Sequence, residues 1–198
     1  MHLSPVRGPR LNQRSVTKNI REGEAMIPIQ KIDCVDSTNN LAMRRIDQGL
    51  TRPILLWAKK QTKGRGQAGK NFDSAEGGLY LTWVIPEPDP LPENLTLKLG
   101  RLFQKTLEPM LAKNDPRKLH VVPLNDLYLD AKKVAGILVE RYKGHLILGF
   151  GMNVLPRSFP EELASIATTF YLQKPATENS LMPIVQALHR AVINTFHL

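Results

Sequence analysis

Cysteine is almost absent from this sequence, which holds only Cys34 among its 198 residues. A single cysteine cannot form a disulfide within the chain, and such usage is typical of proteins from reducing compartments. The sequence also lacks any apolar run near the roughly 20 residues that a membrane-spanning helix needs. Its first residues lack the apolar core of a signal peptide. We therefore expect a cytoplasmic protein that has no membrane partner.

Acidic residues are in the minority, with 18 Asp and Glu against 27 Lys and Arg, and the formal net charge is +9. Such a balance favours nucleic acids, nucleotide phosphates or acidic proteins as partners. Aromatic residues make up only 6% of the chain, and they are not interleaved with the basic ones. Because no nucleic-acid-binding motif is readable either, we expect no specific nucleic acid partner.

The first 26 residues show little apolar periodicity and hold five basic side chains against two acidic ones. We predict that residues 1–26 form a basic, poorly ordered arm. Three alternatives stay open for this segment. It could be a nucleic-acid-binding arm, an organellar transit peptide, or a leader that precedes a natural start at Met26.

Residues 27–198 carry the patterns of a single folded domain, and the hydrophobic content of the whole chain, 42%, suffices for a core. The predicted strands cover 27–35, 53–61, 78–85, 118–123 and three segments between 126 and 153 that turn at 130–132 and 143–144. The predicted helices cover 36–49, 93–113 and 180–198. Strands in adjacent hairpins with a few flanking helices indicate an α+β fold with a mixed or antiparallel sheet.

The segment 61–78, "QTKGRGQAGKNFDSAEGG", places five glycines and five charged side chains between two apolar strands. Gly64, Gly66 and Gly69 would let backbone N–H groups approach an anion closely. Arg65 could form a forked pair with a phosphate or a carboxylate. The spacing matches neither standard phosphate loop, because a strand and not a helix follows it. A solvated hairpin loop is the alternative interpretation.

Three further blocks accompany this loop in the sequence. They are "DSTNNLA" before it, and "NDLYLDAKKVAGILVE" and "LGFGMNVL" after it. The four blocks, in this order and at these spacings, resemble the catalytic domain of biotin protein ligases, which are biotin–[acetyl-CoA-carboxylase] ligases. The resemblance runs from about residue 29 to residue 155.

This resemblance implies an α+β domain related to class II aminoacyl-tRNA synthetases. It implies an enzyme that joins biotin to ATP with Mg²⁺, giving biotinyl-5′-AMP and pyrophosphate. The biotinyl group then passes to one lysine of a biotin carboxyl carrier protein, the expected protein partner. We assign no side chain as a direct metal ligand, and a homodimer stays open.

The resemblance also implies roles for individual residues. Those assigned to biotin are Ser37, Thr38, Gln61, Gly64, Arg65, Gly66, Lys133, Gly136 and Leu138. Those assigned to ATP and the adenylate are Arg65, Gln67, Lys70, Phe72, Asn125, Asp126, Lys133 and Asn153. The expected catalytic residues are Arg65, Lys133 and Asp126.

Arg65 resembles the loop arginine that meets the carboxylate of the ligand and then the adenylate phosphate. Lys133 resembles the lysine that stabilises negative charge on the attacking carboxylate and the α-phosphate. Asn125 and Asp126 resemble a pair that orients the adenylate, binds Mg²⁺ through water or holds the incoming lysine amine. The plainer alternatives are a turn-edge lysine at Lys133 and a turn cap at Asp126.

Ser37, Thr38 and Gln61 would bind the ureido head of biotin, since an unpaired buried polar group costs about 1–3 kcal/mol. Ser37 and Thr38 could equally cap the helix that follows them, and one hydroxyl could cap while its neighbour faces the ligand. Asn153 could pair with backbone at the end of a strand instead of meeting the adenylate.

The sequence departs from the family pattern in several places. The loop has Gln67 and Lys70 where relatives carry arginines, and Phe72 where a tryptophan is usual, so we expect it to hold the adenylate less tightly. The usual Lys-Trp-Pro before Asn125 is replaced over residues 122–124, which lowers the expected rate. We expect neither an N-terminal helix-turn-helix nor a C-terminal β domain, and therefore no repressor activity.

Two other functions stay open. One is a lipoate or octanoate transfer enzyme of the same superfamily, in which Cys34 would carry the acyl group, although we expect Cys34 to be a buried structural residue. The other is a non-catalytic protein that binds biotin or biotinyl-AMP.

Overall fold

The computed structural model describes residues 27–123, 125–171 and 181–198 of the chain. The arm predicted over residues 1–26 lies outside the described residues, and so does Leu124 of the altered 122–124 segment. Within the described part, no helix is long and apolar enough to cross a membrane.

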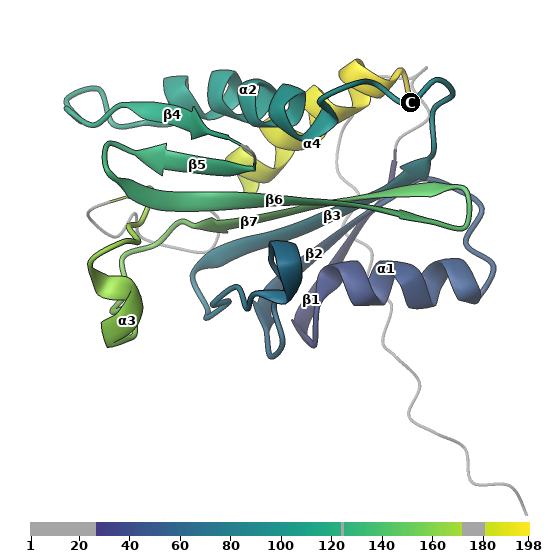
Figure 1. Cartoon of the computed structure of the whole chain (residues 1–198), viewed down its shortest axis with the longest axis horizontal. Coiled ribbons are helices and arrows are strands. Elements are labelled where there is room, and N and C mark those ends of the chain that lie inside the picture. Colours follow the sequence, from purple (N-terminus) through teal and green to yellow (C-terminus); the bar gives the residue numbers. More distant parts are fainter. Residues whose placement is uncertain (1–26, 124, 172–180) are drawn as a thin grey trace, which may run out of the picture.

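A seven-stranded sheet runs through the described part of the molecule in the order β1-β2-β3-β7-β6-β5-β4 (Figure 1). The first pair, β1 and β2, is parallel, and every later pair is antiparallel. The strands are β1 (Ile29–Val35), β2 (Ile54–Gln61), β3 (Gly78–Pro86), β4 (Leu119–Val122), β5 (Asp126–Leu129), β6 (Lys132–Tyr142) and β7 (His145–Asn153). The sheet is therefore mixed, which is one of the two arrangements that we predicted.

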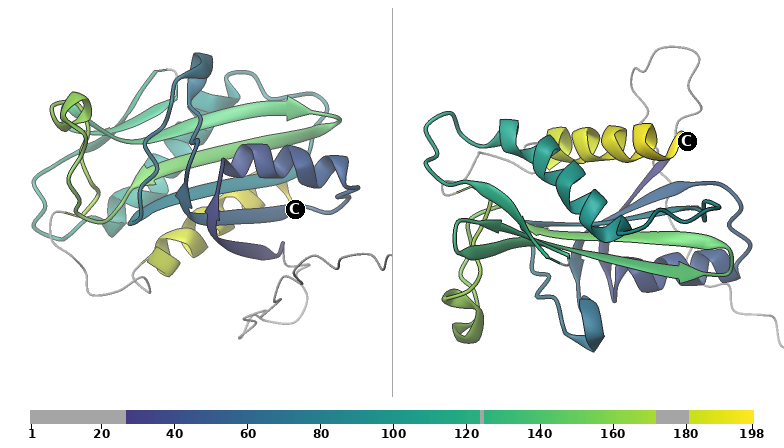
Figure 2. Two further views of the ribbon diagram at one scale, coloured as in Figure 1. Left: turned by 90° about the horizontal axis from the view of Figure 1, so that it is seen from below. Right: turned by 45° about the horizontal axis from the view of Figure 1, so that its top comes forward.

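The helices cover the two faces of the sheet unequally. They are α1 (Thr38–Asp47), α2 (Leu95–Leu107), α3 (Glu161–Ala164) and α4 (Met182–Phe196), with 3₁₀ turns η1 (Gln67–Gly69) and η2 (Glu108–Met110). Helices α2 and α4 pack against each other on one face, whereas α1 lies on the other (Figures 1 and 2). The segment between β2 and β3, which we call the glycine loop (residues 62–77), lies on the α1 side.

The larger hydrophobic core fills the space between the sheet and helices α2 and α4. Phe103 of α2 lies at its centre, with ring centroids 5.8 Å from Trp83 and 4.8 Å from Phe150. A smaller cluster packs Ala42 and Ile46 of α1 against residues of β2, β3 and β7. Because α1 covers only part of its face, the remaining surface of the sheet is left for the glycine loop and a cavity.

The predicted elements are confirmed with small shifts at their ends. The hairpins of β5–β6 and β6–β7 turn where expected, through Asp130 at φ 52°, Lys143 at φ 47° and Gly144 at φ 75°. The one-turn helix α3 was not predicted. Cys34 is exposed, so the prediction of a buried cysteine was wrong. The reason is that β1 lies at the edge of the sheet. The apolar pattern of a strand does not show whether the strand lies at an edge or in the centre.

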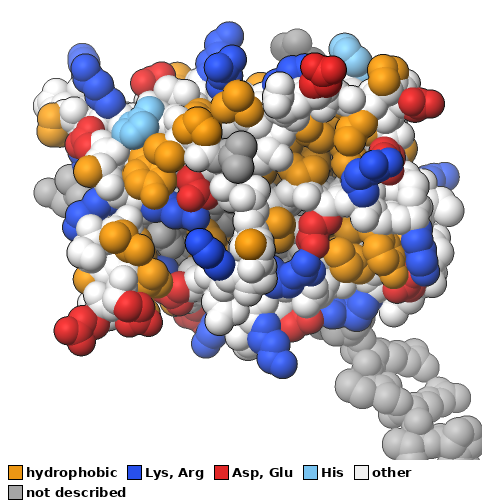
Figure 3. Space-filling model, in the orientation of Figure 1, with side chains coloured by type: hydrophobic (Ala, Val, Ile, Leu, Met, Phe, Trp, Pro, Cys, Tyr) orange, Lys and Arg blue, Asp and Glu red, His pale blue; other side chains and the backbone are white. Residues whose placement is uncertain are grey.

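The charged side chains are mixed on the face shown in Figure 3, where Lys and Arg alternate with Asp and Glu between patches of hydrophobic atoms. The excess of positive charge is therefore dispersed on this face.

His189 on α4 is a buried titratable group in the larger core. The indole nitrogen of Trp83 can only donate, and it lies 3.1 Å from His189 Nδ1. Nδ1 is therefore the acceptor, and Nε2 carries the proton that it donates to the carbonyl of Ile27 at 3.1 Å. Burial lowers the pKa of this imidazole below its ordinary value of 6.5. Protonation of Nδ1 would break the bond from Trp83.

We expect the free energy of unfolding to fall as the pH drops below 6.5. The unfolded chain then binds a proton on His189 that the folded protein resists, which costs at most about 1.4 kcal/mol per pH unit. The His189→Gln variant keeps a donor and an acceptor but does not titrate. Urea denaturation at pH 7.5 and 5.5 should show a smaller loss for this variant than for the wild type. Equal losses would contradict the assignment.

Candidate active site

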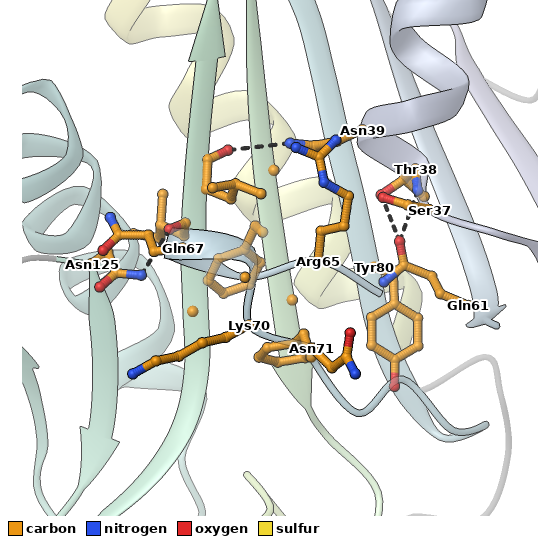
Figure 4. A pocket seen from close by; sticks show the side chains of 18 of the residues that line it. Ser37, Thr38, Asn39, Gln61, Arg65, Gln67, Lys70, Asn71, Tyr80 and Asn125 are labelled. Atoms are coloured by element: carbon orange, nitrogen blue, oxygen red, sulfur yellow. Dashed lines mark hydrogen bonds between the residues drawn. The ribbon is translucent and has the colours of Figure 1, made fainter. Parts of the chain in front are cut away.

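A cavity of about 260 Å³ opens on the α1 side of the sheet. The first turn of α1, the glycine loop and strands β2, β3, β5, β6 and β7 line it (Figure 4). Most of the predicted site residues meet here: Ser37, Thr38, Gln61, Arg65, Gly66, Gln67, Lys70, Phe72, Asn125, Asp126, Lys133, Gly136 and Leu138. Gly64 and Asn153 do not line the cavity. Segments that are far apart in the sequence thus converge on one site.

The α1 end of the cavity is built by Gln61, the last residue of β2. Its Oε1 accepts hydrogen bonds from the backbone N–H of Thr38 at 2.8 Å and from the Thr38 hydroxyl at 3.1 Å (Figure 4). Its Nε2 donates to the hydroxyl of Ser74 at 2.9 Å. Gln61, at the end of β2, therefore accepts the two hydrogen bonds that Thr38 donates from the first turn of α1.

Ser37 occupies the N-cap position of α1, but its side chain makes no capping hydrogen bond. The alternative interpretation, in which Ser37 or Thr38 caps the helix through its hydroxyl, was therefore wrong. Ser37 is only 2% exposed and lines the cavity. The described residues offer its hydroxyl no hydrogen-bond partner, so this group is free to bind a ligand.

Three glycines form part of the cavity floor, and a Cβ on two of them would clash with a cavity side chain. A Cβ on Gly149 would lie 2.5 Å from Asn39 Oδ1, and one on Gly151 would lie 2.8 Å from the ring of Phe72. A Cβ on Gly136, which pairs with Gly151 across β6 and β7, would lie 3.4 Å from Lys133 Cε. The side chains of the site thus pack directly on strand backbone.

An irregularity in β6 determines where Lys133 points. Leu127 pairs with Ala135, but the next residue of β5, Tyr128, pairs with Lys133, so Val134 is an extra residue in the strand. In regular alternation Lys133 would share the core face of Ala135. The β-bulge turns Val134 into the core instead and places Lys133 at the cavity.

The backbone of Lys133 is held by the segment that follows β7. Its N–H donates to the carbonyl of Ile166 at 2.8 Å, and its carbonyl accepts from the N–H of Thr168 at 2.9 Å. Its ammonium lies 2.8 Å from Asp126 Oδ1 and 5.8 Å from the ring centroid of Phe72. Asp126 Oδ1 is buried and receives no well-directed hydrogen bond. Lys133 and Asp126 therefore form an ion pair in the cavity lining.

Phe72 forms part of the wall beside Lys133. Its ring meets Tyr80 edge-on, with centroids 6.4 Å apart. The Tyr80 hydroxyl donates to the carbonyl of Ala75 at 2.6 Å, and burial raises the pKa of this phenol well above its ordinary range. Tyr80 is therefore a neutral donor that fixes the end of the glycine loop.

Arg65 lines the same cavity as Lys133, but its guanidinium is turned towards α1 (Figure 4). Nη1 donates to Asn40 Oδ1 at 2.6 Å, and Nη2 forms an ion pair with Glu140 on β6. The predicted meeting of Arg65 with a ligand carboxylate would therefore involve a guanidinium that already has two protein partners.

Asn125 and Asn153 have structural partners. Asn125 Nδ2 donates to the carbonyl of Ile137 at 3.1 Å, and the Asn125 carbonyl accepts from the N–H of Ile137 at 2.8 Å. Asn153 Oδ1 accepts from Arg157 Nη2 at 3.0 Å, outside the cavity. Arg157 in turn pairs with Asp73 at 2.6 Å. Asn153 thus helps to anchor the outgoing end of the glycine loop.

Gly64 lies behind the cavity wall. A Cβ there would lie 2.3 Å from Ser74 Oγ and 2.4 Å from the carbonyl oxygen of Phe72. Its own carbonyl accepts from the N–H of Phe72 at 2.9 Å. This glycine permits the two arms of the loop to approach closely.

Several cavity residues were not predicted as site residues. They are Asn39, Ala68, Asn71, Tyr80, Leu81, Ile137, Gly149, Phe150 and Gly151. Asn39 lies inside the "DSTNNLA" block and the two glycines inside "LGFGMNVL", so the blocks contained the signal. What the sequence did not show is which members of each block face the ligand side.

The sequence profile of the Biotin/lipoate A/B protein ligase family matches residues 32–155. This range begins within β1 and ends just after β7, so it contains every residue that lines the cavity.

Curated relatives cover the same region. The chain is 30% identical over 145 residues to the bifunctional ligase/repressor BirA of Bacillus subtilis (strain 168), an alignment that spans 69% of this chain and 44% of that protein. It is 27% identical over 167 residues to the biotin–[acetyl-CoA-carboxylase] ligase of Mycobacterium tuberculosis, spanning 81% and 62%. The chain therefore spans less than two thirds of the length of either relative.

Among solved structures, the biotin protein ligase from Aquifex aeolicus in complex with biotin and ATP superposes with a TM-score of 0.68. The two sequences are 30% identical, and the match covers 83% of this chain and 70% of that one. The mixed sheet with flanking helices is thus the α+β fold of biotin protein ligases, as the sequence predicted.

Replacing Gly149 with Ala should lower the free energy of unfolding by about 1–3 kcal/mol, because the new methyl overpacks the floor. Asn39 cannot withdraw without losing its bonds to Thr82 at 2.7 Å and Glu140 at 2.8 Å. The matched control is Gly136→Ala, whose Cβ meets its neighbours at 3.4 Å or more. This control should change stability by less than about 1 kcal/mol. Urea denaturation measures both, and equal losses would contradict the packing account.

Proposed function

The chain belongs to the Biotin/lipoate A/B protein ligase family, and from this we propose that residues 27–198 form the catalytic domain of a biotin protein ligase. The proposed enzyme joins biotin to ATP and passes the biotinyl group to a lysine of a biotin carboxyl carrier protein, in the cytoplasm. One observation carries the proposal: a single cavity holds the unpartnered hydroxyl of Ser37 together with the cations of Arg65 and Lys133.

The α1 end of the cavity suits the ureido head of biotin. Ser37 supplies a hydroxyl that can donate or accept, and Gln61 keeps one amide N–H beyond the hydrogen bond that it gives to Ser74. Two hydrogen bonds join Thr38 to Gln61, so the side chains of Thr38 and Gln61 are preorganised for a ligand. A ligand that lacked the matching polar atoms would leave buried groups unpaired and would bind more weakly by about 1–3 kcal/mol for each group.

The Lys133 end suits the chemical step. A carboxylate oxygen of biotin attacks the α-phosphorus of ATP, the bond from this phosphorus to the bridging oxygen breaks, and pyrophosphate leaves. The product is an acyl-phosphate anhydride. The Lys133 ammonium would stabilise the charge that gathers between the two anions, because it is already held by a fixed backbone and by Asp126. Phe72 would shield the anhydride from water.

In the second step, the amine of the carrier lysine attacks the anhydride carbonyl and AMP leaves, so that an amide is formed. We assign Asp126 to orient this amine, because its carboxylate lines the cavity beside the Lys133 ammonium. Asn125 holds the turn that positions Asp126 through its two contacts with Ile137. The net result is one ATP consumed and one biotinyl amide formed.

The described residues fit a magnesium ion that arrives with ATP rather than one held by the protein alone. No group of three or more His, Cys, Asp or Glu that could hold a metal occurs in the described ranges. Asp126 and Asn125 are the oxygen donors at this end of the cavity. Magnesium usually keeps several waters and takes one or two carboxylates besides phosphates. When bound, it would neutralise phosphate charge.

The altered segment 122–124 does not change this assignment. Val122 ends β4 and Pro123 is exposed, and neither lines the cavity. Leu124 lies outside the described residues. The low rate expected from this segment stays a prediction, as does the weaker hold on the adenylate expected from Gln67, Lys70 and Phe72.

A lipoate or octanoate transfer enzyme is the second candidate within the family. Its acyl-carrying thiol would be Cys34, but Cys34 lies on the edge strand β1 and does not line the cavity. A non-catalytic biotin-binding protein is the third candidate. It would need the α1 end alone, and it leaves the Lys133–Asp126 pair and the bulge without a role.

Incubation with biotin, MgATP and an isolated biotin carboxyl carrier domain should biotinylate that domain. Lys133→Ala should slow this labelling by about 100-fold or more, since it removes the cation at the site of developing charge. Lys132→Ala is the matched control, because the Lys132 side chain points away and donates to the carbonyl of Ala164 at 3.1 Å. Its rate should stay within about twofold of wild type.

Three results would count against the proposal. Biotin binding without pyrophosphate release would favour the non-catalytic protein, and labelling with lipoate or octanoate in preference to biotin would favour the second candidate. An equal loss in the two lysine variants would show that Lys133 has no special part.

A further inference from the structure

Glu140 on β6 connects two elements that surround the α1 end of the cavity. Its Oε2 accepts a hydrogen bond from Asn39 Nδ2 on α1 at 2.8 Å, and its Oε1 pairs with Arg65 Nη2 of the glycine loop. The Glu140 side chain is 19% exposed and that of Arg65 is 37% exposed. The contact is therefore partly shielded from water, unlike most surface ion pairs, which contribute little.

Only a carboxylate serves both partners. Asn39 and Arg65 each present an N–H donor, so the group between them must offer two acceptors, and an ionised Glu does this. An amide at the same place would have to aim its own NH₂ at one of these donors. Asn39 is further fixed by the hydroxyl of Thr82, which donates to Asn39 Oδ1 at 2.7 Å. Glu140 thus ties the loop to a buried part of the sheet.

The glycine loop is attached to β6 through Arg65, which lies in the part of the loop that lines the cavity. Arg65 and Asn71 form an isolated antiparallel bridge, and the N–H of Gly66 donates to the carbonyl of Lys70 at 2.7 Å. The turn between these residues carries Gln67, which lines the cavity. Holding the Arg65 side chain therefore holds this whole turn over the cavity. Loss of the Glu140 contact would leave the Arg65 guanidinium with one described partner, Asn40 Oδ1 on α1 at 2.6 Å.

We propose that Glu140 is a positioning residue that latches the glycine loop, through Arg65 and Asn39, over the α1 end of the cavity before ligand binds. Glu140 does not act on the reacting atoms. Its effect on biotin rests on the proposed function, because that effect requires the α1 end to be the biotin end. The latch itself does not depend on the proposed function, since it concerns the ligand-free protein.

The first experiment compares Glu140→Gln with Glu87→Gln by limited trypsin digestion of the ligand-free chain, followed by mass spectrometry. Glu87 is the matched control, because it pairs with Arg141, the next residue of β6, at 2.5 Å. Cleavage after Lys63, Arg65 and Lys70 reports the open loop, since proteolysis follows the population of the open form when opening is fast. Cleavage after Lys105 in α2 reports general unfolding.

Loop cleavage should become about three to ten times faster in Glu140→Gln, as expected for the loss of one charge-assisted hydrogen bond, and should stay unchanged in Glu87→Gln. The ratio of loop cleavage to cleavage after Lys105 should rise in Glu140→Gln. This ratio keeps the test decisive if the variant is less stable overall. Equal loop cleavage in the two variants, or an unchanged ratio, would overturn the latch.

The second experiment measures pyrophosphate release with each substrate varied. Glu140→Gln should raise the KM for biotin by about three- to tenfold, while kcat changes by less than about twofold, because Glu140 holds the loop and does not act on the reacting atoms. A fall in kcat with an unchanged KM for biotin would overturn the positioning role. Absence of any biotin-dependent turnover in the wild type would contradict the proposed function instead, and the trypsin comparison would still decide the latch.

Discussion

The extra residue Val134 in β6 is the feature on which the site depends. Strands alternate their side chains strictly, and Ala135 and Ile137 of β6 belong to the core. Without the bulge, Lys133 would follow them into that core, where an unpaired ammonium is very costly to bury. With the bulge, Val134 fills the core position and Lys133 faces Asp126 and Phe72. The one-residue shift thus places the Lys133 side chain at the cavity and not in the core.

The two faces of the sheet are packed differently, because one is covered by the larger hydrophobic core and the other carries the cavity. Helices α2 and α4 bury the larger core, in which aromatic rings pack closely and His189 is held neutral between Trp83 and Ile27. On the other face, glycines replace side chains so that Asn39 and Phe72 can lie on strand backbone. The packed core and the cavity share strands β3, β6 and β7, so the core fixes the backbone on which the cavity is built.

Much of the fold could be predicted from the sequence, because it is specified locally. Apolar alternation located the strands, and turn chemistry at Asp130 and Gly144 located the hairpins. The family resemblance located most of the cavity residues. Interactions between distant segments could not be predicted. The cap that Gln61 gives to α1 joins residues 23 apart in sequence, and the bond between Asn39 and Glu140 joins residues 101 apart. The bulge is a matter of register, which no single-strand pattern contains.

The central claim is that this cavity forms a mixed anhydride between the biotin carboxylate and the α-phosphate of ATP. Exchange of radiolabelled pyrophosphate into ATP, measured without any carrier protein, tests this most directly, because it requires the anhydride to form and to reverse on the enzyme. The account predicts exchange that depends strictly on biotin. Exchange that proceeds without biotin, or no exchange while biotin and ATP are both bound, would contradict it.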